Sequence, residues 1–234
     1  MMSECKETPY PYLFSPNRDI RLIGITGKSG SGKSSVADYL VNNFLDLDKF
    51  AFATALKESC AKAFGLDIYS FYGSEEKETV HPLWGVTPRE IAQFVGTELF
   101  RQKINEILPI TLGPNFWVKR LFGYMQGSLP DDAGTYLNLD GTVCVIEDVR
   151  FQNEVEFIEK NNGHIISVIK EGDIHEVGIP GHESEKQQLV FSNDHLTVVH
   201  NDRTLEDLHS WCRDWGRKHG LVPLDPHYSH SSKY

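Results

Sequence analysis

The sequence predicts an α/β fold: a mostly parallel sheet with helices on both faces. Short apolar runs typical of buried strands alternate with segments whose apolar residues recur at helical spacing; these runs are "IRLIGIT", "TVCVIEDVR", "HIISVIK" and "LTVVH". Because helical segments separate successive strands, the strands are expected to run parallel. With 234 residues, the chain is long enough for one substantial core and an inserted subdomain.

The predicted domain covers residues 20–220. Residues 1–19 are polar and proline-rich and form an N-terminal extension, and residues 221–234 form a C-terminal tail. About residues 66–130 are expected to form a helical insertion, and the Gly- and Pro-bearing stretch of about 171–190 a mobile excursion. No internal repeat or domain-scale linker is found, so we expect a single domain with an insertion.

Helix ends are predicted by capping signals. "TPRE" at 87–90 and "TLED" from Thr204 both place an acid three residues after a Thr N-cap, and a helix from about Ala55 is expected to end at Gly65. The acidic run "GSEEKE" at 73–78 is interpreted as a solvated loop. The helix after "TPRE" is expected to bury Ile91, Phe94, Val95 and Leu99. The last helix is expected to bury Leu205, Leu208, Cys212 and Trp215.

Composition excludes several classes of protein. The four cysteines are far apart and form no Cys-x-x-Cys pair, which argues against a zinc site or a disulfide framework and for a reducing, cytoplasmic compartment. No run approaches the length of a membrane span, and the N-terminus lacks the order of a signal peptide. A net charge of −10 would repel polymeric nucleic acid over most of the surface, although a small anion can still bind locally.

A glycine-rich turn between the first strand and the first helix matches the phosphate-binding loop. "GKSGSGKS" at 27–34 has the spacing of that motif, in the strand–loop–helix context that it requires. Its backbone N–H groups and the helix N-terminus favour a triphosphate, which predicts a P-loop NTPase fold that binds ATP. Lys33 is expected to reach the β- and γ-phosphates and Ser34 to ligate Mg²⁺. The predicted ATP-binding residues are Gly27, Lys28, Ser29, Gly30, Ser31, Gly32, Lys33, Ser34 and Ser35.

A second charged group is predicted at the end of the strand "TVCVIEDVR". Asp148 is in the position where such folds carry the acid that holds Mg²⁺, directly or through water, and a solvated turn residue is the alternative. Glu147 is expected to point to the opposite side if the strand is regular there. Arg150 is suited to phosphate oxygens at this edge. Lys33, Asp148 and Arg150 are therefore the predicted catalytic residues.

Several blocks in the same order resemble the bacteriophage deoxynucleoside monophosphate kinases. They include "KFAFATALKESCAKAFG", "REIAQFVGTELFRQ", "NFWVKRLF", "VIEDVRFQNEVEFI", "GHESE" and "NDRTLEDL", within about residues 20–210. The resemblance implies transfer of the γ-phosphoryl group of ATP to the 5′-phosphate of a deoxynucleoside monophosphate, giving the diphosphate and ADP. It also implies a nucleoside-monophosphate-binding insertion, a lid at 171–190, a homodimer, and a phage protein that acts in the host cytoplasm to supply DNA precursors.

By the same resemblance, Lys57 and Arg101 would contact the acceptor phosphate or its surroundings. Gln93 and Glu98 are polar residues beside the apolar stripe of their helix and are candidates for reading the base edge or sugar. Thr97 follows Gly96 inside that helix, which predicts a close approach to a ligand or to a neighbouring helix. Trp117 would lie against the base, although a core position is the alternative. Glu154, Lys170 and Glu185 complete the expected substrate-binding set, with Glu185 in the "GHESE" lid. Two departures, "FATALK" and the Lys at 170 where the family commonly has Arg, put the detailed acceptor contacts in doubt.

Other functions stay open at this point. A hydroxyl acceptor, as in dephospho-coenzyme A kinases or nucleoside kinases, would need an acid such as Asp148 as base. A non-catalytic ATP-sensing module would bind ATP without turnover, which the additional cations argue against. A hydrolase would need a residue that positions water, for which Gln152 is a candidate. We expect no metal site at "GHESE" or in the His-bearing tail.

Overall fold

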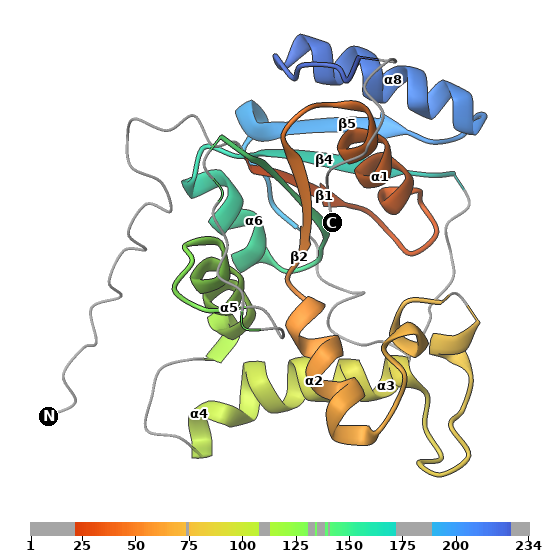
Figure 1. The fold of residues 1–234 in the computed structure, drawn as a ribbon, viewed down its shortest axis with the longest axis vertical. Helices are drawn as coiled ribbons and strands as arrows, with labels where there is room; N and C mark the ends of the chain where they lie inside the picture. Colours follow the sequence, from red (N-terminus) through yellow and green to blue (C-terminus); the bar gives the residue numbers. More distant parts are fainter. Residues whose placement is uncertain are drawn as a thin grey trace, which may run out of the picture.

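The protein is described from a computed structural model, which places residues 22–107 except 74, 113–130, 134, 139, 141–171 and 189–225. A parallel five-stranded sheet has the strand order β2-β3-β1-β4-β5 (Figure 1). The strands are β1 (Leu22–Thr26), β2 (Leu47–Ala51), β3 (Val143–Val149), β4 (His164–Ile169) and β5 (Leu196–His200). The predicted α/β class with parallel strands is confirmed.

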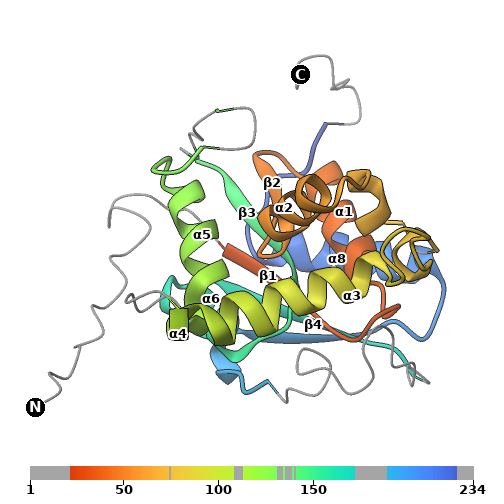
Figure 2. The same ribbon diagram turned by 90° about the horizontal axis from the view of Figure 1, so that it is seen from below.

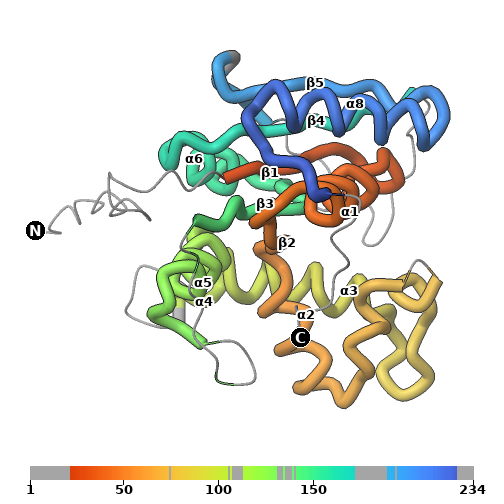
Figure 3. The backbone as a smooth tube through the Cα atoms, turned by 45° about the horizontal axis from the view of Figure 1, so that its top comes forward, coloured from red at the N-terminus to blue at the C-terminus, as the bar shows by residue number. Residues whose placement is uncertain are grey.

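Helices cover both faces of the sheet, because buried side chains of each strand alternate between two hydrophobic clusters. Helices α1 (Lys33–Asn43) and α8 (Leu205–Lys218) pack on the face that carries Ile23 and Ile25. Helices α5 (Phe116–Met125) and α6 (Gln152–Lys160) pack on the opposite face, with Leu22 and Ile146. The core therefore lies on both sides of the sheet, and Figure 3 shows the helices on its two faces.

A group of helices lies beyond the carboxyl end of β2, outside the sheet (Figure 2). It begins with α2 (Thr54–Phe64) and continues through the short helices η1 (Ile68–Phe71) and η2 (Glu76–Glu78). A long rod then follows, made of α3 (Pro88–Gln93), the π-helix η3 (Phe94–Lys103) and α4 (Ile104–Ile107). The remaining short helices are η4 (Gly113–Asn115) and η5 (Asn193–His195).

The capping predictions are confirmed. The hydroxyl groups of Thr87 and Thr204 each accept a hydrogen bond from the backbone N–H three residues on. The backbone N–H groups of the two threonines in turn donate to the carboxylates of Glu90 and Asp207, which completes both capping boxes. Gly65 ends α2 in the left-handed conformation, where it avoids the strain that a side chain would add.

Two predicted core positions are exposed, and Val95 and Leu99 are only partly buried. Phe94 is 56% exposed, because the buried face of this rod carries Gln93, Thr97 and Arg101 instead. Leu205 is 57% exposed, since it occupies the first turn of α8, while Leu208, Cys212 and Trp215 form the buried face as predicted.

Among the described residues, no helix is both long and apolar enough to cross a membrane. Cys60, Cys144 and Cys212 are buried free thiols, and burial raises the pKa of Cys144 and Cys212 to about 12. The predicted N-terminal extension, residues 172–188 of the predicted lid and the tail from residue 226 lie outside the described residues.

Candidate active site

The glycine-rich loop connects β1 to α1 in a conformation that requires glycine. Gly27, Gly30 and Gly32 have φ angles of 145°, 81° and 103°. A Cβ atom at Gly27 would lie 2.3 Å from the carbonyl oxygen of Val168, which is backbone and cannot move aside cheaply. The loop is thus held close against β4. Asn201, just after β5, donates its side-chain amide to the Ser31 carbonyl oxygen at 2.8 Å and ties the loop to a second strand end.

Lys33 begins α1, and its ammonium group lies over its own loop. Nζ donates to the carbonyl oxygens of Gly27 at 2.8 Å and Lys28 at 2.7 Å, and lies 3.6 Å from a carboxylate oxygen of Asp148. Of the nine residues predicted to bind ATP, Ser29, Gly30, Lys33 and Ser34 line a cavity. The others belong to the loop around it, except Ser35, which lies in the first turn of α1. Lys33 is therefore held between the phosphate-binding loop and the end of β3.

The end of β3 is bulged rather than regular. Gly24 pairs with Ile146, but Thr26 pairs with Val149, so β3 contains an extra residue, and Asp148 adopts a φ of 63°. The Thr26 hydroxyl donates to the Val149 carbonyl oxygen at 2.7 Å and holds this irregular segment. As a result, Glu147 and Asp148 both line the cavity. The opposite directions expected for Glu147 and Asp148 required a regular strand, and the bulge means that this condition is not met.

Asp148 is the centre of a charged cluster. Arg150 contacts one of its carboxylate oxygens through Nε at 2.9 Å and through Nη2 at 2.8 Å. Burial alone would raise the pKa of Asp148, but Arg150 and then Lys33 outweigh it and lower this pKa to about 2. The Asp148 carboxyl is therefore an anion at neutral pH.

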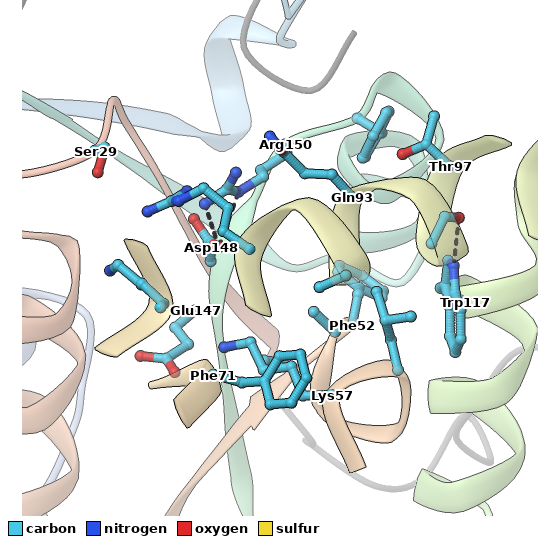
Figure 4. Close-up of a pocket in the computed structure, with 18 of the residues that line it drawn as sticks. Ser29, Phe52, Lys57, Phe71, Gln93, Thr97, Trp117, Glu147, Asp148 and Arg150 are labelled. Atoms are coloured by element: carbon cyan, nitrogen blue, oxygen red, sulfur yellow. Dashed lines mark hydrogen bonds and ion pairs between the residues drawn. The ribbon is translucent and has the colours of Figure 1, made fainter. Parts of the chain in front are cut away.

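The cavity has a volume of about 310 Å³ and extends from the phosphate-binding loop to the helices outside the sheet. Figure 4 shows Ser29, Asp148, Glu147 and Arg150 toward one end, and Phe52, Thr97 and Trp117 toward the other. Leu56 and Phe71 add further apolar wall. The cavity thus joins a charged end, suited to phosphate groups, to a partly aromatic end suited to a flat ring.

The π-helix shapes the aromatic end. Gln93, Thr97 and Arg101, spaced four residues apart, are buried and line the cavity. A π-helix has a longer turn than an α-helix, so this spacing brings three polar side chains to one face. The indole N–H of Trp117 donates to the Gly96 carbonyl oxygen at 2.9 Å, which fixes α5 against the π-helix. Trp117 is both a wall of the cavity and a core residue.

Arg101 is bound in a buried ion pair within the cavity wall. Its Nη2 lies 2.6 Å from Oε1 of Glu154, its Nη1 donates to the Pro114 carbonyl oxygen at 3.0 Å, and its guanidinium stacks 3.7 Å from the centre of the Phe151 ring. Glu154 also accepts the backbone N–H groups of Arg150 and Phe151. Burial raises the pKa of Glu154, against the opposite effect of Arg101 and these N–H groups. Glu154 therefore fixes the backbone that carries Arg150.

Lys57 lies in the cavity wall on α2, with its ammonium group 4.0 Å from the centre of the Tyr72 ring. Burial lowers the pKa of Lys57, partly offset by the nearby Asp148 and Glu147. The predicted residues Glu98 and Lys170 do not line the cavity, and Glu185 lies outside the described residues.

Two cations of the cavity were missed at the sequence level. Lys77, on η2, and Arg89, on α3, both line it. Lys77 stands in the run interpreted as a solvated loop, and no local signal distinguishes it from a surface lysine. Arg89 is inside the recognised capping box, but capping says nothing about the direction of its side chain.

The residues predicted to hold Mg²⁺ fit that ion. Ser34 and Asp148 line the same cavity and supply a hydroxyl and an ionised carboxylate, the hard oxygen ligands that Mg²⁺ takes beside phosphate oxygens and water. In the described part of the chain, no three His, Cys, Asp or Glu side chains gather as a metal site of their own. Two protein ligands would leave the other positions around such an ion to water and phosphate oxygens.

Comparison with known proteins identifies a viral relative. "Putative deoxynucleotide monophosphate kinase" of Acanthamoeba polyphaga mimivirus is 32% identical over 191 residues, which are 81% of this chain and 92% of that protein. No model of a protein family matches the chain.

Solved structures give only distant similarity. A Janibacter sugar kinase is 11% identical with a TM-score of 0.37, covering 84% of this chain and 94% of its own. The Deinococcus radiodurans tunicamycin resistance protein is 10% identical with a TM-score of 0.38, covering 88% and 99%. Similarity this low carries no argument, so the fold rests on the sheet topology described above.

Proposed function

This chain belongs to the deoxynucleotide monophosphate kinase family, and we propose that it transfers the γ-phosphoryl group of ATP to the 5′-phosphate of a deoxynucleoside monophosphate. The products are the deoxynucleoside diphosphate and ADP. The observation that carries the proposal is one continuous cavity of about 310 Å³, which connects the phosphate-binding loop to a partly aromatic chamber through a cluster of cations.

The donor triphosphate would lie on the glycine-rich loop. Backbone N–H groups of the loop and the N-terminus of α1 would bind its phosphates, and Lys33 would exchange its carbonyl contacts for the β- and γ-phosphate oxygens. Ser34 and Asp148 would hold Mg²⁺, which when bound neutralises charge on the phosphate oxygens.

The acceptor phosphate would lie between the loop and the aromatic chamber. One of its oxygens attacks the γ-phosphorus, the bond from that phosphorus to the β–γ bridging oxygen breaks, and ADP leaves with the electron pair. With a second pKa near 6, a phosphate monoester is already largely a dianion at neutral pH, so no strong base is needed. Alignment and charge neutralisation by Lys33, Lys57 and Arg150 would supply most of the catalysis.

The state of Asp148 favours a phosphate over a hydroxyl acceptor. A hydroxyl would need a general base with a pKa near the working pH, whereas Arg150 and Lys33 lower the pKa of Asp148 to about 2. A carboxylate this acidic is a weak base and a good partner for cations. The contacts of Asp148 with Arg150 and Lys33 therefore support a role in holding cations.

The predicted substrate residues take different roles in this proposal. Gln93 and Thr97 would contact the base or sugar, and Trp117 would form the wall beside the base. Arg101 and Glu154 would act mainly by positioning, since each is bound to the other inside the wall. Roles for Glu98, Lys170 and Glu185 rest on the family resemblance alone.

The sequence composition and the same resemblance support several finer proposals. These are a kinase domain at 20–220 with the insertion at about 66–130 and the lid at about 171–190, a homodimer, a bacteriophage origin, a cytoplasmic location, and small nucleotides rather than polymeric nucleic acid as partners.

An ADP-release assay tests the function. With ATP and Mg²⁺, we expect one or more of dAMP, dGMP, dCMP and dTMP to stimulate ADP release, and Lys33→Ala to abolish it. Lys160→Ala is the matched control, because Lys160 is an exposed lysine on α6 paired only with Glu156 in the described structure. ADP release without an acceptor, release only with hydroxyl acceptors, or ATP binding without turnover would each overturn the proposal.

A further inference from the structure

The cations of the cavity differ in what balances their charge. Arg150 pairs with Asp148, Arg101 with Glu154 and Arg89 with Glu78, at 2.8, 2.6 and 2.5 Å. Lys33 is bound by loop carbonyl groups and lies near Asp148. Within the described residues, Lys57 and Lys77 are the lining cations that have no carboxylate within ion-pair distance.

Lys57 and Lys77 lie close enough to repel each other. Burial is the largest cause that lowers the pKa of Lys77, followed by the positive charge of Arg89, with Arg150 contributing further. Burial also lowers the pKa of Lys57, against the opposite effect of Asp148 and Glu147, and the positive charges of Arg150 and Lys77 lower it further. Repulsion between half-buried cations raises the free energy of the folded protein, and an anion bound between them lowers it again. The surroundings of these two lysines therefore favour a bound anion.

The Glu78–Arg89 ion pair fixes the segment that carries Lys77. Glu78 is the next residue along η2, and its carboxylate contacts Nε of the largely buried Arg89 on α3. Arg89 also lines the cavity, so this pair holds η2 at the cavity edge. The neighbouring Lys77 can then face the space between α2 and the end of β3.

We propose that Lys77 binds the phosphate of the acceptor nucleotide together with Lys57, and that Glu78 is a positioning residue that holds Lys77 in place. This rests on the proposed function and extends it to a residue outside the blocks that resemble known kinases. The ligand is a phosphate monoester dianion, whose oxygens would contact ammonium groups from two separate elements, α2 and η2. The acidic run at 73–78 thus contributes a cation to the site.

Steady-state kinetics separate this role from a general structural one. We expect Lys77→Ala to raise the KM of the preferred deoxynucleoside monophosphate about 10- to 100-fold, with the KM of ATP changed less than about 2-fold. Lys77→Arg should restore most of the affinity, and Glu78→Gln should raise the same KM by about 3- to 10-fold. Lys62→Ala is the control, because Lys62 is an exposed lysine on α2 that does not line the cavity.

Calorimetric titration with the four deoxynucleoside monophosphates tests the inference separately from turnover. If the wild type binds one of them and Lys77→Ala binds it at least about 10-fold more weakly, the inference stands even where no ADP is formed, and only the proposed reaction fails. If Lys77→Ala, with an unchanged melting temperature, keeps the wild-type KM and Kd, Lys77 does not bind the phosphate. A wild type that binds none of the four overturns both proposals.

Discussion

At the residue scale, the Arg101–Glu154 pair is expected to determine how tightly the cavity wall is held. Glu154→Gln removes the charge that balances a buried guanidinium and weakens the bonds to two backbone N–H groups, so we expect a loss of about 3 kcal/mol in the free energy of unfolding. Urea denaturation measures it. Glu156→Gln on the same helix, which breaks the exposed pair with Lys160, should cost less than about 0.5 kcal/mol. Equal losses of unfolding free energy in the two variants would contradict the role of Glu154 in holding the cavity wall.

Asn201 provides a second test at this scale, on the donor side. Asn201→Ala removes the amide that donates to the Ser31 carbonyl oxygen, so the phosphate-binding loop loses its tie to the end of β5. We expect the KM of ATP to rise about 3- to 10-fold, while the KM of the acceptor stays nearly constant. Asn161→Ala is the matched control, because it removes a similar bond, to the Phe157 carbonyl oxygen, far from the loop. A similar KM of ATP in both variants would show that the tie has no role.

Single residues also show what sequence patterns can predict. Lys33, Ser34 and Asp148 could be assigned to one site because the glycine spacing and the strand end depend on local chemistry. Lys77 could not, since an acidic run around a lysine is typical of solvated loops, and only the packing of η2 against α3 brings this lysine to the cavity. Residues placed by tertiary contacts leave no local pattern.

At the element scale, the π-helix forms part of the wall of the proposed acceptor side of the cavity. Trp117→Phe keeps an aromatic ring, although a smaller one, and removes the N–H that donates to the Gly96 carbonyl oxygen. We expect a loss of about 1 kcal/mol in the free energy of unfolding and a rise of about 3-fold or more in the acceptor KM, since Gln93 and Thr97 would be held less firmly. Both quantities are measured on the same preparation.

A matched control for this variant is Trp84→Phe. Trp84 donates its indole N–H to the Phe64 carbonyl oxygen at 3.0 Å, but it is 43% exposed and does not line the cavity. The Trp84→Phe variant should therefore have the same acceptor KM as the wild type. If both variants change this KM equally, the π-helix does not act through Trp117.

Elements differ in how far they could be predicted. Strands and capped helices were predicted because apolar periodicity and the Thr87 and Thr204 boxes are read directly from neighbouring residues. The bulge at Asp148 and the π-helix from Phe94 were not predicted. Each adds one residue to a regular strand or helical turn, and the residues around it have no composition that indicates this. Both irregularities lie in the cavity wall, and both change which side chains face it.

At the scale of the whole molecule, the order of the strands explains why the site forms where it does. The cavity contains the loop after β1, Ala51 at the end of β2 and Asp148 at the end of β3, and these strands are neighbours in the sheet. Parallel strands bring their carboxyl ends to one edge, so residues more than a hundred positions apart meet there. The helices that follow β2 then close the other side of the cavity.

The stability of the whole fold should fall with acid because of His164, which lies between the sheet and α8. Its Nε2 lies 2.7 Å from the Thr197 hydroxyl oxygen, and its ring faces Trp215 and His219. Burial, then the positive charges that His219 and His195 would carry, lower the pKa of His164 to about 4. In the unfolded chain, this pKa returns to about 6.5.

The folded and unfolded pKa values of His164 determine how its contribution to stability changes with pH. Above about pH 6.5 His164 is neutral in both states, whereas between about pH 6.5 and 4 the unfolded chain binds the proton first, so folding loses stability as the pH falls. Since the ring is only half-buried, we expect a loss of about 1–2 kcal/mol from this residue, after allowing for solvent screening. His164→Gln should therefore lose less stability than the wild type when urea denaturation is repeated from about pH 7.5 to about pH 4.5. If the two stability curves stay parallel over that range, His164 does not contribute to the acid sensitivity.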